Sequence, residues 1–161
     1  MVELKKITLL SNEMKECIAL NVAPEQEDYV YTNAITLALA YRNNIKDIVW
    51  ECRAIYASGK MVGLITYQYF IDPPCYKETC YRIRPLMVDK GQLGKGYEEA
   101  AIRKLLEEIR TKPQGDAAAV FVTYDPKEED MPKLYQSIGF TKTDITLKTH
   151  NGDNIIARMS L

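Results

Sequence analysis

A glycine-rich stretch at residues 91–96, Gly-Gln-Leu-Gly-Lys-Gly, lies between a β-rich segment and a strong amphipathic helical pattern. Such a turn can bind phosphate, because glycine lets the backbone approach closely and a helix N-terminus offers N–H groups with a partial positive charge. A Walker A loop would need lysine where Tyr97 stands, and a dinucleotide fingerprint would need glycine where Glu99 stands, so both motifs are excluded. The stretch therefore indicates either another kind of phosphate-binding turn or a simple tight turn.

Cysteine and histidine offer little further chemistry. The single histidine, His150, comes directly before Asn151-Gly152, a hairpin-turn signal, so we expect a solvated turn residue rather than a catalytic base. The cysteines form no CxxC pair, so we expect no metal site and free thiols in a reducing cytosol. Two of them flank a short loop and would be able to pair if oxidised. The four are Cys17, Cys52, Cys75 and Cys80, the last two flanking the loop.

The size and charge of the chain exclude several classes of protein. Its 161 residues and 18.4 kDa are the size of one domain, 1–161. A net charge of −1 argues against nonspecific nucleic-acid binding, which normally needs a basic excess. No apolar stretch approaches the roughly 20 residues of a membrane span, and the N-terminus has no signal-peptide core. We therefore expect a cytoplasmic protein with neither nucleic-acid nor membrane partners.

Hydrophobic periodicity predicts the elements around the glycine turn. Expected strands are Leu4–Leu10, Val49–Tyr56, Met61–Phe70, Thr79–Asp89, Ala117–Val122, Phe140–Lys148 and Asn154–Met159. Expected helices are Glu13–Leu20, one from Pro24 towards Tyr41, Tyr97–Ile109, and a short one that ends at Gly139. The strand–helix–strand unit over residues 79–122 implies one parallel strand pair. The fold class is therefore α+β with a mixed sheet.

Two motifs resemble those of the GNAT N-acetyltransferases. Residues 86–97 are similar to the family's acetyl-CoA motif, Gln/Arg-x-x-Gly-x-Gly/Ala, at a strand–helix junction. The second motif of the family is a strand and then a helix that ends in Leu-Tyr-x-x-x-Gly-Phe. This chain resembles it at residues 120–123 and then at Leu134-Tyr135-Gln136-Ser137-Ile138-Gly139-Phe140. The resemblance covers essentially the whole chain. It implies a mostly antiparallel central sheet with a parallel, splayed central strand pair and flanking helices. Within the family, the chain is most similar to bacterial spermine/spermidine N-acetyltransferases.

The resemblance implies direct transfer of an acetyl group from acetyl-CoA, a co-substrate that needs no metal, to an amine. The pantetheine arm would pair with the strand edge at residues 86–88, and the N–H of Met87 or Val88 would stabilise the oxyanion. Tyr135 would protonate the departing thiolate, unless it is simply a core tyrosine. Pyrophosphate would lie on the N–H groups of residues 94–98. The implied acetyl-CoA-binding residues are Leu86, Met87, Val88, Leu93, Gly94, Lys95, Gly96, Tyr97, Glu98 and Thr123.

Four positions depart from the family pattern. Leu93 stands at the Gln/Arg position of the first motif, and Glu98 stands at its final Gly/Ala position. A carboxylate there disfavours pyrophosphate unless it points outward. Glu128 replaces an asparagine that often contacts CoA. Arg84 stands where polyamine acetyltransferases often have an acidic residue.

The acceptor that the resemblance implies is spermine, spermidine or a similar small amine. We expect Glu25, Glu27 and Asp28 to attract it, and Arg84 to be neutralised by an ion pair at the substrate site. The three acids are somewhat more typical of an ordinary solvated helix start. Two other functions stay open: acetylation of another amine, such as a protein N-terminus, an amino acid or an antibiotic, and a degenerate CoA-binding non-enzyme. The sequence is also compatible with a homodimer.

Overall fold

The structure is a computed structural model that describes residues 1–8, 11–27, 31–46, 48–149 and 152–161. Asp28, His150 and Asn151, which the sequence singles out, lie outside the described residues, as does the side chain of Glu25.

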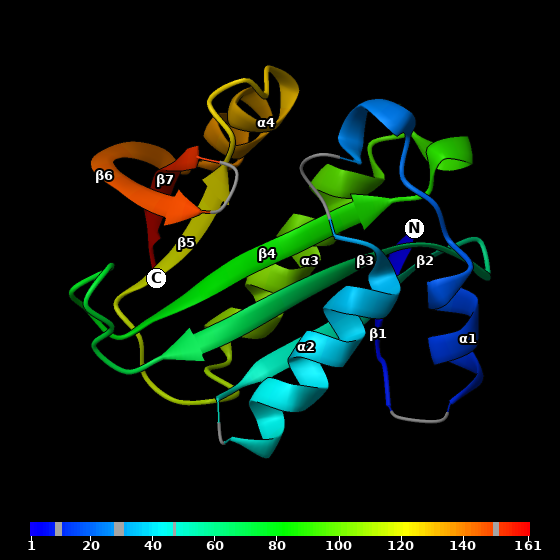
Figure 1. The fold of residues 1–161 in the computed structure, drawn as a ribbon, viewed down its shortest axis with the longest axis horizontal. Helices are drawn as coiled ribbons and strands as arrows, with labels where there is room; N and C mark the ends of the chain where they lie inside the picture. Colours follow the sequence, from blue (N-terminus) through cyan, green and yellow to red (C-terminus); the bar gives the residue numbers. More distant parts are fainter. Residues whose placement is uncertain (9–10, 28–30, 47, 150–151) are drawn as a thin grey trace.

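Seven strands of the described chain form one sheet in the order β1-β2-β3-β4-β5-β7-β6 (Figure 1). All neighbouring strands are antiparallel except β4 and β5, which are parallel. The predicted mixed sheet with one parallel pair is therefore confirmed. The strands are β1 (Val2–Lys6), β2 (Trp50–Ala57), β3 (Lys60–Phe70), β4 (Cys80–Val88), β5 (Ala119–Tyr124), β6 (Thr141–Thr149) and β7 (Gly152–Ser160).

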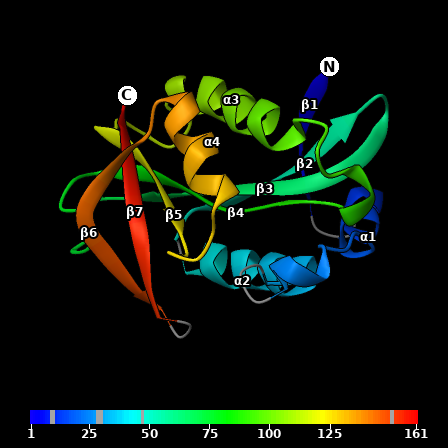
Figure 2. The ribbon, with the colours of Figure 1, turned by 90° about the horizontal axis from the view of Figure 1, so that it is seen from above.

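Helices cover both faces of the sheet (Figure 2). Two of them, α3 (Tyr97–Arg110) and α4 (Asp130–Ile138), lie on one face, and α1 (Asn12–Ile18) and α2 (Asn33–Ile45) lie on the other. Two 3₁₀ turns, η1 (Pro24–Gln26) and η2 (Lys90–Gln92), lead into α2 and α3 along the chain. Helix α4 ends at Gly139, whose φ of 115° suits glycine, as the sequence predicts.

The bounds of two predicted elements are wrong. The first strand ends at Lys6 rather than Leu10, and residues 9–10 lie outside the described chain. The helix predicted from Pro24 towards Tyr41 begins instead at Asn33 and ends at Ile45. The hydroxyl of Thr32 accepts a hydrogen bond from the N–H of Ile35 at 3.3 Å and so forms the N-cap. Pro24 starts only the short turn η1.

Alternating side chains of the sheet divide the core into two layers. On the α3 face, Tyr81 and Ile83 of β4 pack in one cluster with Val120 and Val122 of β5 and with the buried stripe of α3. On the α2 face, Met87 packs in a second cluster with residues of β2, β3 and α2. Because successive side chains of a strand point to opposite faces, this division fixes which side of the sheet each β4 residue serves.

The cysteines are free thiols, as predicted, and Cys17, Cys52 and Cys80 are buried. No helix in the described ranges is long and apolar enough to cross a membrane.

Candidate functional site

The central parallel strands separate after four paired residues. Residues 80–83 of β4 pair with residues 119–122 of β5, and β4 then continues to Val88 while β5 diverges from it. On its other edge, β4 stays paired with β3 as far as Val88. The last five residues of β4 therefore have a backbone edge that β5 does not cover, in the middle of the sheet rather than at its rim. The predicted splayed pair is confirmed in this respect.

A β-bulge lies where the two strands separate. Ile83 faces Tyr67 and Leu86 faces Ile65, so Arg84 and Pro85 together stand opposite Thr66 alone. The Thr66 hydroxyl donates a hydrogen bond to the carbonyl oxygen of Arg84 at 2.5 Å. Pro85 has no N–H, so it would leave a gap in any ladder at this point. The bulge thus marks the start of the open edge.

The open edge presents particular N–H groups. In an antiparallel ladder, the peptide groups of successive residues point to alternate edges of the strand. The N–H of Asp89 points to β3, where it donates to the carbonyl oxygen of Val62 at 2.8 Å. By alternation, the N–H groups of Val88 and Leu86 point to the side from which β5 has diverged.

The glycine turn connects this edge to α3. Gly94 and Gly96 both have φ of 73°, and a Cβ on either would meet no atom within 4 Å. Only glycine adopts this conformation without strain, and the open space leaves the backbone accessible. The first α3 hydrogen bond runs from the N–H of Ala100 to the carbonyl oxygen of Gly96 at 3.1 Å, so the N–H groups before it lack an acceptor within the helix. The geometry therefore fits an anion.

Contacts at its start hold the turn in place. One carboxylate oxygen of Asp89 accepts from the N–H of Gly91 at 3.0 Å, and the other accepts from the N–H of Asn21 at 3.1 Å. The Lys95 ammonium donates to the side-chain oxygen of Gln92 at 2.8 Å, which keeps its charge beside the turn. The segment before α2 and the turn before α3 are thus tied together.

A cleft of about 100 Å³ opens between the separated strands. It brings together seven residues that the sequence predicted for the site with four that it did not assign there, among them Glu128, which the sequence singled out only as a departure from the family pattern. Those predicted for the site are Arg84, Leu86, Met87, Val88, Glu98, Thr123 and Tyr135, and the additional ones are Gln26, Pro85, Glu128 and Met131.

Tyr135 reaches the cleft from the α3 face. Its ring stacks on Tyr124 with centroids 6.0 Å apart and meets Phe140 edge-on at 5.7 Å. The side chain is buried in the core cluster that contains α3. Burial, followed by the negative charge of Glu128, raises the pKa of Tyr135 above its ordinary range. The hydroxyl therefore stays protonated at neutral pH, as a general acid must.

Arg84 reaches the same cleft from the α2 face. Its Nη1 donates to the Thr123 hydroxyl at 2.9 Å, a contact that bridges β4 and β5 just beyond their last paired residues. Burial, followed by the like charge of Arg82, lowers the pKa of Arg84. Among the described residues no carboxylate lies within ion-pair distance of it, so the expected ion pair is not found there.

Glu128 is the carboxylate that sequence reasoning left without a role. It lines the cleft, and its Oε1 accepts a hydrogen bond from the N–H of Asp125 at 2.9 Å. Burial raises the pKa of Glu128, and the positive charge of Arg84 acts against this shift. Its position just before the helix was visible in the sequence, but its direction depends on how residues 125–129 fold back.

Other predicted site residues have different surroundings. The side chains of Leu93 and Tyr97 pack against the core on the α3 face, so they contribute backbone rather than side chains to the turn. Glu98 lines the cleft and is half-buried. Glu27 is exposed, and its neighbour Gln26 lines the cleft instead. Within the described residues, no group of histidine, cysteine and carboxylate side chains could hold a metal ion.

Comparison with solved structures gives many matches along the whole chain. An aminoglycoside acetyltransferase solved with coenzyme A matches with a TM-score of 0.72 and 16% identity, over 99% of this chain and 95% of that chain. The ribosomal-protein-S18-alanine N-acetyltransferase from Escherichia coli matches with a TM-score of 0.69 and 15% identity, over 99% of this chain and 94% of that chain. A chain from Desulfovibrio desulfuricans, assigned to the GNAT acetyltransferases, matches with a TM-score of 0.66 and 15% identity, over 99% of both chains.

No family model matches the sequence, and no curated protein matches it. At these identities, the structural likeness shows the fold: this chain has the GNAT acetyltransferase fold, as its two motifs predicted.

Proposed function

We propose that this protein is an N-acetyltransferase that transfers an acetyl group from acetyl-CoA directly to an amine. The observation that supports this most is the continuity of the open β4 edge with the glycine turn at the N-terminus of α3. A strand edge suits the amide-bearing pantetheine arm, and the turn suits a pyrophosphate. Structural neighbours include an acetyltransferase solved with coenzyme A.

Acetyl-CoA supplies a thioester carbonyl that an amine can attack. The N–H of Val88 points to the open edge and would stabilise the charge that develops on the carbonyl oxygen. Of the two candidates from the sequence, Met87 and Val88, strand alternation therefore favours Val88. Tyr135, on the opposite side of the opening, would give its proton to the departing thiolate.

An alkyl ammonium ion has a pKa near 10, so it must lose a proton before it attacks. Glu128 is suited to receive that proton, because it lines the cleft and burial raises its pKa towards the working range. Of the acids at residues 25–28 that the sequence singled out to attract the amine, Glu27 is exposed and is not among the residues that line the cleft.

The polyamine acceptor stays a prediction of the resemblance. A polyamine with several positive charges needs an acidic site. The cleft has carboxylates at Glu98 and Glu128, but it also has Arg84, with Arg82 close enough to lower the pKa of Arg84. Spermine and spermidine therefore belong in the substrate panel beside amines of other charge.

Calorimetric titration with acetyl-CoA, followed by a thiol-release assay with a panel of amines, tests the function. Gly96→Asp should weaken acetyl-CoA binding by about tenfold or more relative to Gly96→Asn, because the two side chains have the same shape and only one opposes the pyrophosphate. Gly59→Asp is the matched control, since Gly59 has φ of 77° and equally open surroundings in the β2–β3 turn.

Each result has a clear meaning. Binding together with amine-dependent thiol release supports the acetyltransferase. Binding without release from any amine points to the second candidate, a CoA-binding non-enzyme, which the unusual residues Glu98 and Arg84 in the cleft favour. No heat of binding at millimolar acetyl-CoA would overturn both.

A further inference from the structure

Arg82 and Arg84 lie side by side on the same face of β4. They are two residues apart on one strand, and the regular pairing with β3 continues as far as Ile83, directly before the bulge that Arg84 begins, so their side chains leave the sheet in the same direction, about 6–7 Å apart at the backbone. Their neighbours Tyr81 and Ile83 belong to the core on the α3 face. Both arginines therefore leave the sheet on the α2 face, opposite to the face on which Tyr135 is buried, and Arg84 lines the cleft from that side.

Both guanidinium groups are partly buried and are held by neutral partners. Arg82 Nε donates to the side-chain oxygen of Gln68 at 2.9 Å, and its Nη1 donates to the Tyr76 hydroxyl at 3.4 Å. Its guanidinium carbon also lies 5.4 Å from the centroid of the Phe70 ring. These contacts fix the orientation of Arg82, and none of the three partners carries a charge that would neutralise it.

Arg84 has donors to spare. In the described part of the chain, the one acceptor bound to its guanidinium is the Thr123 hydroxyl. The nearby charge of Arg82 acts on it more strongly than that of Glu128, which faces the cleft from the α4 side. Two partly buried cations that pair with no carboxylate of the described residues repel each other, and a bound anion would relieve that repulsion.

We propose that Arg82 and Arg84 form an anion subsite on the acceptor side of the cleft, so that the amine that is acetylated also bears a carboxylate. The proposal rests on the proposed acetyltransferase function and names its class of substrate. Arginine donors are arranged in a planar fork that matches a carboxylate. The carboxylate would lie on the α2 face beside β4, while the amine lies at the opening between β4 and β5.

The test compares amines that differ only in the carboxylate. The matched pairs are phenylalanine with phenethylamine, tryptophan with tryptamine and lysine with cadaverine, and spermidine is assayed beside them. At saturating acetyl-CoA, at least one amino acid should have a kcat/KM about tenfold or more above its decarboxylated partner. Arg84→Gln and Arg82→Gln should each bring that ratio towards one, and Arg84→Lys should restore part of it.

Arg110→Gln is the matched control, because it removes an exposed arginine from the far end of α3 and should leave the ratio unchanged. Equal or higher kcat/KM for the decarboxylated amines, or for spermidine, would overturn the proposal and leave the acetyltransferase function standing. An effect of Arg110→Gln as large as that of Arg84→Gln would also overturn it, since general charge would then explain the preference.

A binding measurement keeps the proposal testable without turnover. Trp50, the single tryptophan, donates its indole N–H to the Thr66 hydroxyl at 2.9 Å, and that hydroxyl contacts the Arg84 carbonyl. Its fluorescence should report titration of the CoA-bound protein with N-acetylphenylalanine and with N-acetylphenethylamine. The acid should bind more tightly, and Arg84→Gln should remove the difference. Equal affinities would contradict the subsite, whereas failure to bind acetyl-CoA at all would contradict the proposed function.

Discussion

Tyr135 lies at the boundary between the core and the cleft. Its ring packs with Tyr124 and Phe140 on the α3 face, and the residue also lines the opening between β4 and β5. Packing restricts the rotamers of the side chain, so the hydroxyl is held in one place. Burial that raises its pKa keeps the proton on the oxygen at neutral pH, so the proton is available to a departing thiolate in contact with the hydroxyl.

Tyr135→Phe removes this proton and leaves the ring. We expect kcat to fall by about 10²-fold or more, with little change in the dissociation constant of acetyl-CoA. Tyr124→Phe is the control, because it removes the hydroxyl of the stacked neighbour. Steady-state kinetics and calorimetry on both variants decide the matter. Equal rates for wild type and Tyr135→Phe, with chemistry rate-limiting, would leave Tyr135 as a core residue.

Glu128→Gln should separate catalysis from stability. Burial raises the pKa of Glu128, so the folded state binds its proton more tightly than the unfolded state does, and ionisation at higher pH lowers the free energy of unfolding. Removing the charge should therefore leave stability at about pH 7 unchanged or slightly higher, while kcat/KM falls by about tenfold or more.

Glu129→Gln, at the exposed neighbouring position, is the control for Glu128→Gln and should change neither quantity. The measurements are urea unfolding and pH–rate profiles of the two variants. Loss of both stability and activity in Glu128→Gln would show that the carboxylate has a structural role instead.

Single residues of the site differ in how far the sequence reveals them. Tyr135 and the glycines at positions 94 and 96 stand in motifs whose spacing identifies them. Glu128 stands at a motif position too, but the motif predicts asparagine there and no role for a carboxylate, because the place of Glu128 in the cleft depends on the fold of residues 125–129 and on its bond with the Asp125 N–H. The surroundings of Arg84 likewise come from three strands that are distant in sequence.

At the scale of elements, the open edge of β4 depends on how closely β3 approaches it. Gly63 of β3 faces Val88, and a Cβ at Gly63 would lie 2.3 Å from the carbonyl oxygen of Met87. No side chain fits there unless a strand shifts. Gly63 therefore sets the position of the residues that would bind the pantetheine arm and the oxyanion.

Gly63→Ala should displace the end of β4. We expect the free energy of unfolding to fall by about 1–3 kcal/mol from overpacking, and acetyl-CoA to bind more weakly because Leu86 and Val88 move. Gly59→Ala is the control: its positive φ strains the backbone by about 1 kcal/mol, but no atom opposes its Cβ.

Chemical denaturation and calorimetry of both glycine variants separate loss of stability from displacement of the edge. Weaker binding in Gly59→Ala to the same extent as in Gly63→Ala would refute the positional role of Gly63.

Sequence patterns located some elements better than others. Helix α3 was predicted within one residue of its end, because a polar face makes its buried stripe periodic. Helix α2 was misplaced because apolar side chains lie all round it, with Ile35, Tyr41 and Ile45 exposed. The separation of β4 from β5 was expected from the resemblance alone, since strand periodicity contains no signal for where pairing stops.

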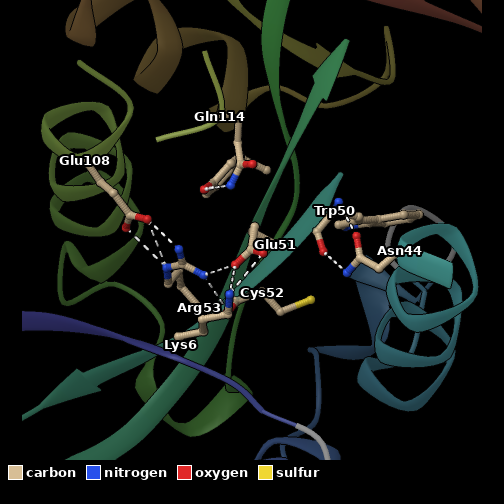
Figure 3. Close-up of polar contacts among 9 residues, drawn as sticks. Lys6, Asn44, Trp50, Glu51, Cys52, Arg53, Glu108 and Gln114 are labelled. Atoms are coloured by element: carbon tan, nitrogen blue, oxygen red, sulfur yellow. Dashed lines mark hydrogen bonds and ion pairs between the residues drawn. The ribbon is translucent and has the colours of Figure 1, made fainter. Parts of the chain in front are cut away.

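For the whole molecule, a polar network joins β1, β2 and α3 (Figure 3). Arg53 of β2 donates to Glu108 of α3 at 3.2 Å and to Glu51 at 2.9 Å, and Lys6 of β1 pairs with Glu51 at 2.9 Å. The side chains of Arg53 and Glu51 are only 10% and 15% exposed. Loss of one partner would leave a buried charge with incomplete compensation.

Acid should weaken this network, and Glu51→Gln should show it. Burial opposes ionisation of Glu51, but hydrogen bonds from Arg53 and Lys6 outweigh it and lower the pKa of Glu51. A depressed pKa in the folded state stabilises the protein above the ordinary value of 4.5, and this stabilisation is lost as pH falls through the folded pKa. At about pH 7, Glu51→Gln should therefore lower the free energy of unfolding by about 1–3 kcal/mol.

The gap between wild type and Glu51→Gln should then shrink below about pH 4.5, because the wild-type carboxyl also loses its charge. Urea unfolding at a series of pH values measures the gap. Glu107→Gln is the control, since that carboxylate is 66% exposed on α3 and its pair with Lys104 contributes little. A gap that stays constant with pH would mean that Glu51 acts through packing, and that its charge does not help to hold α3 against the sheet.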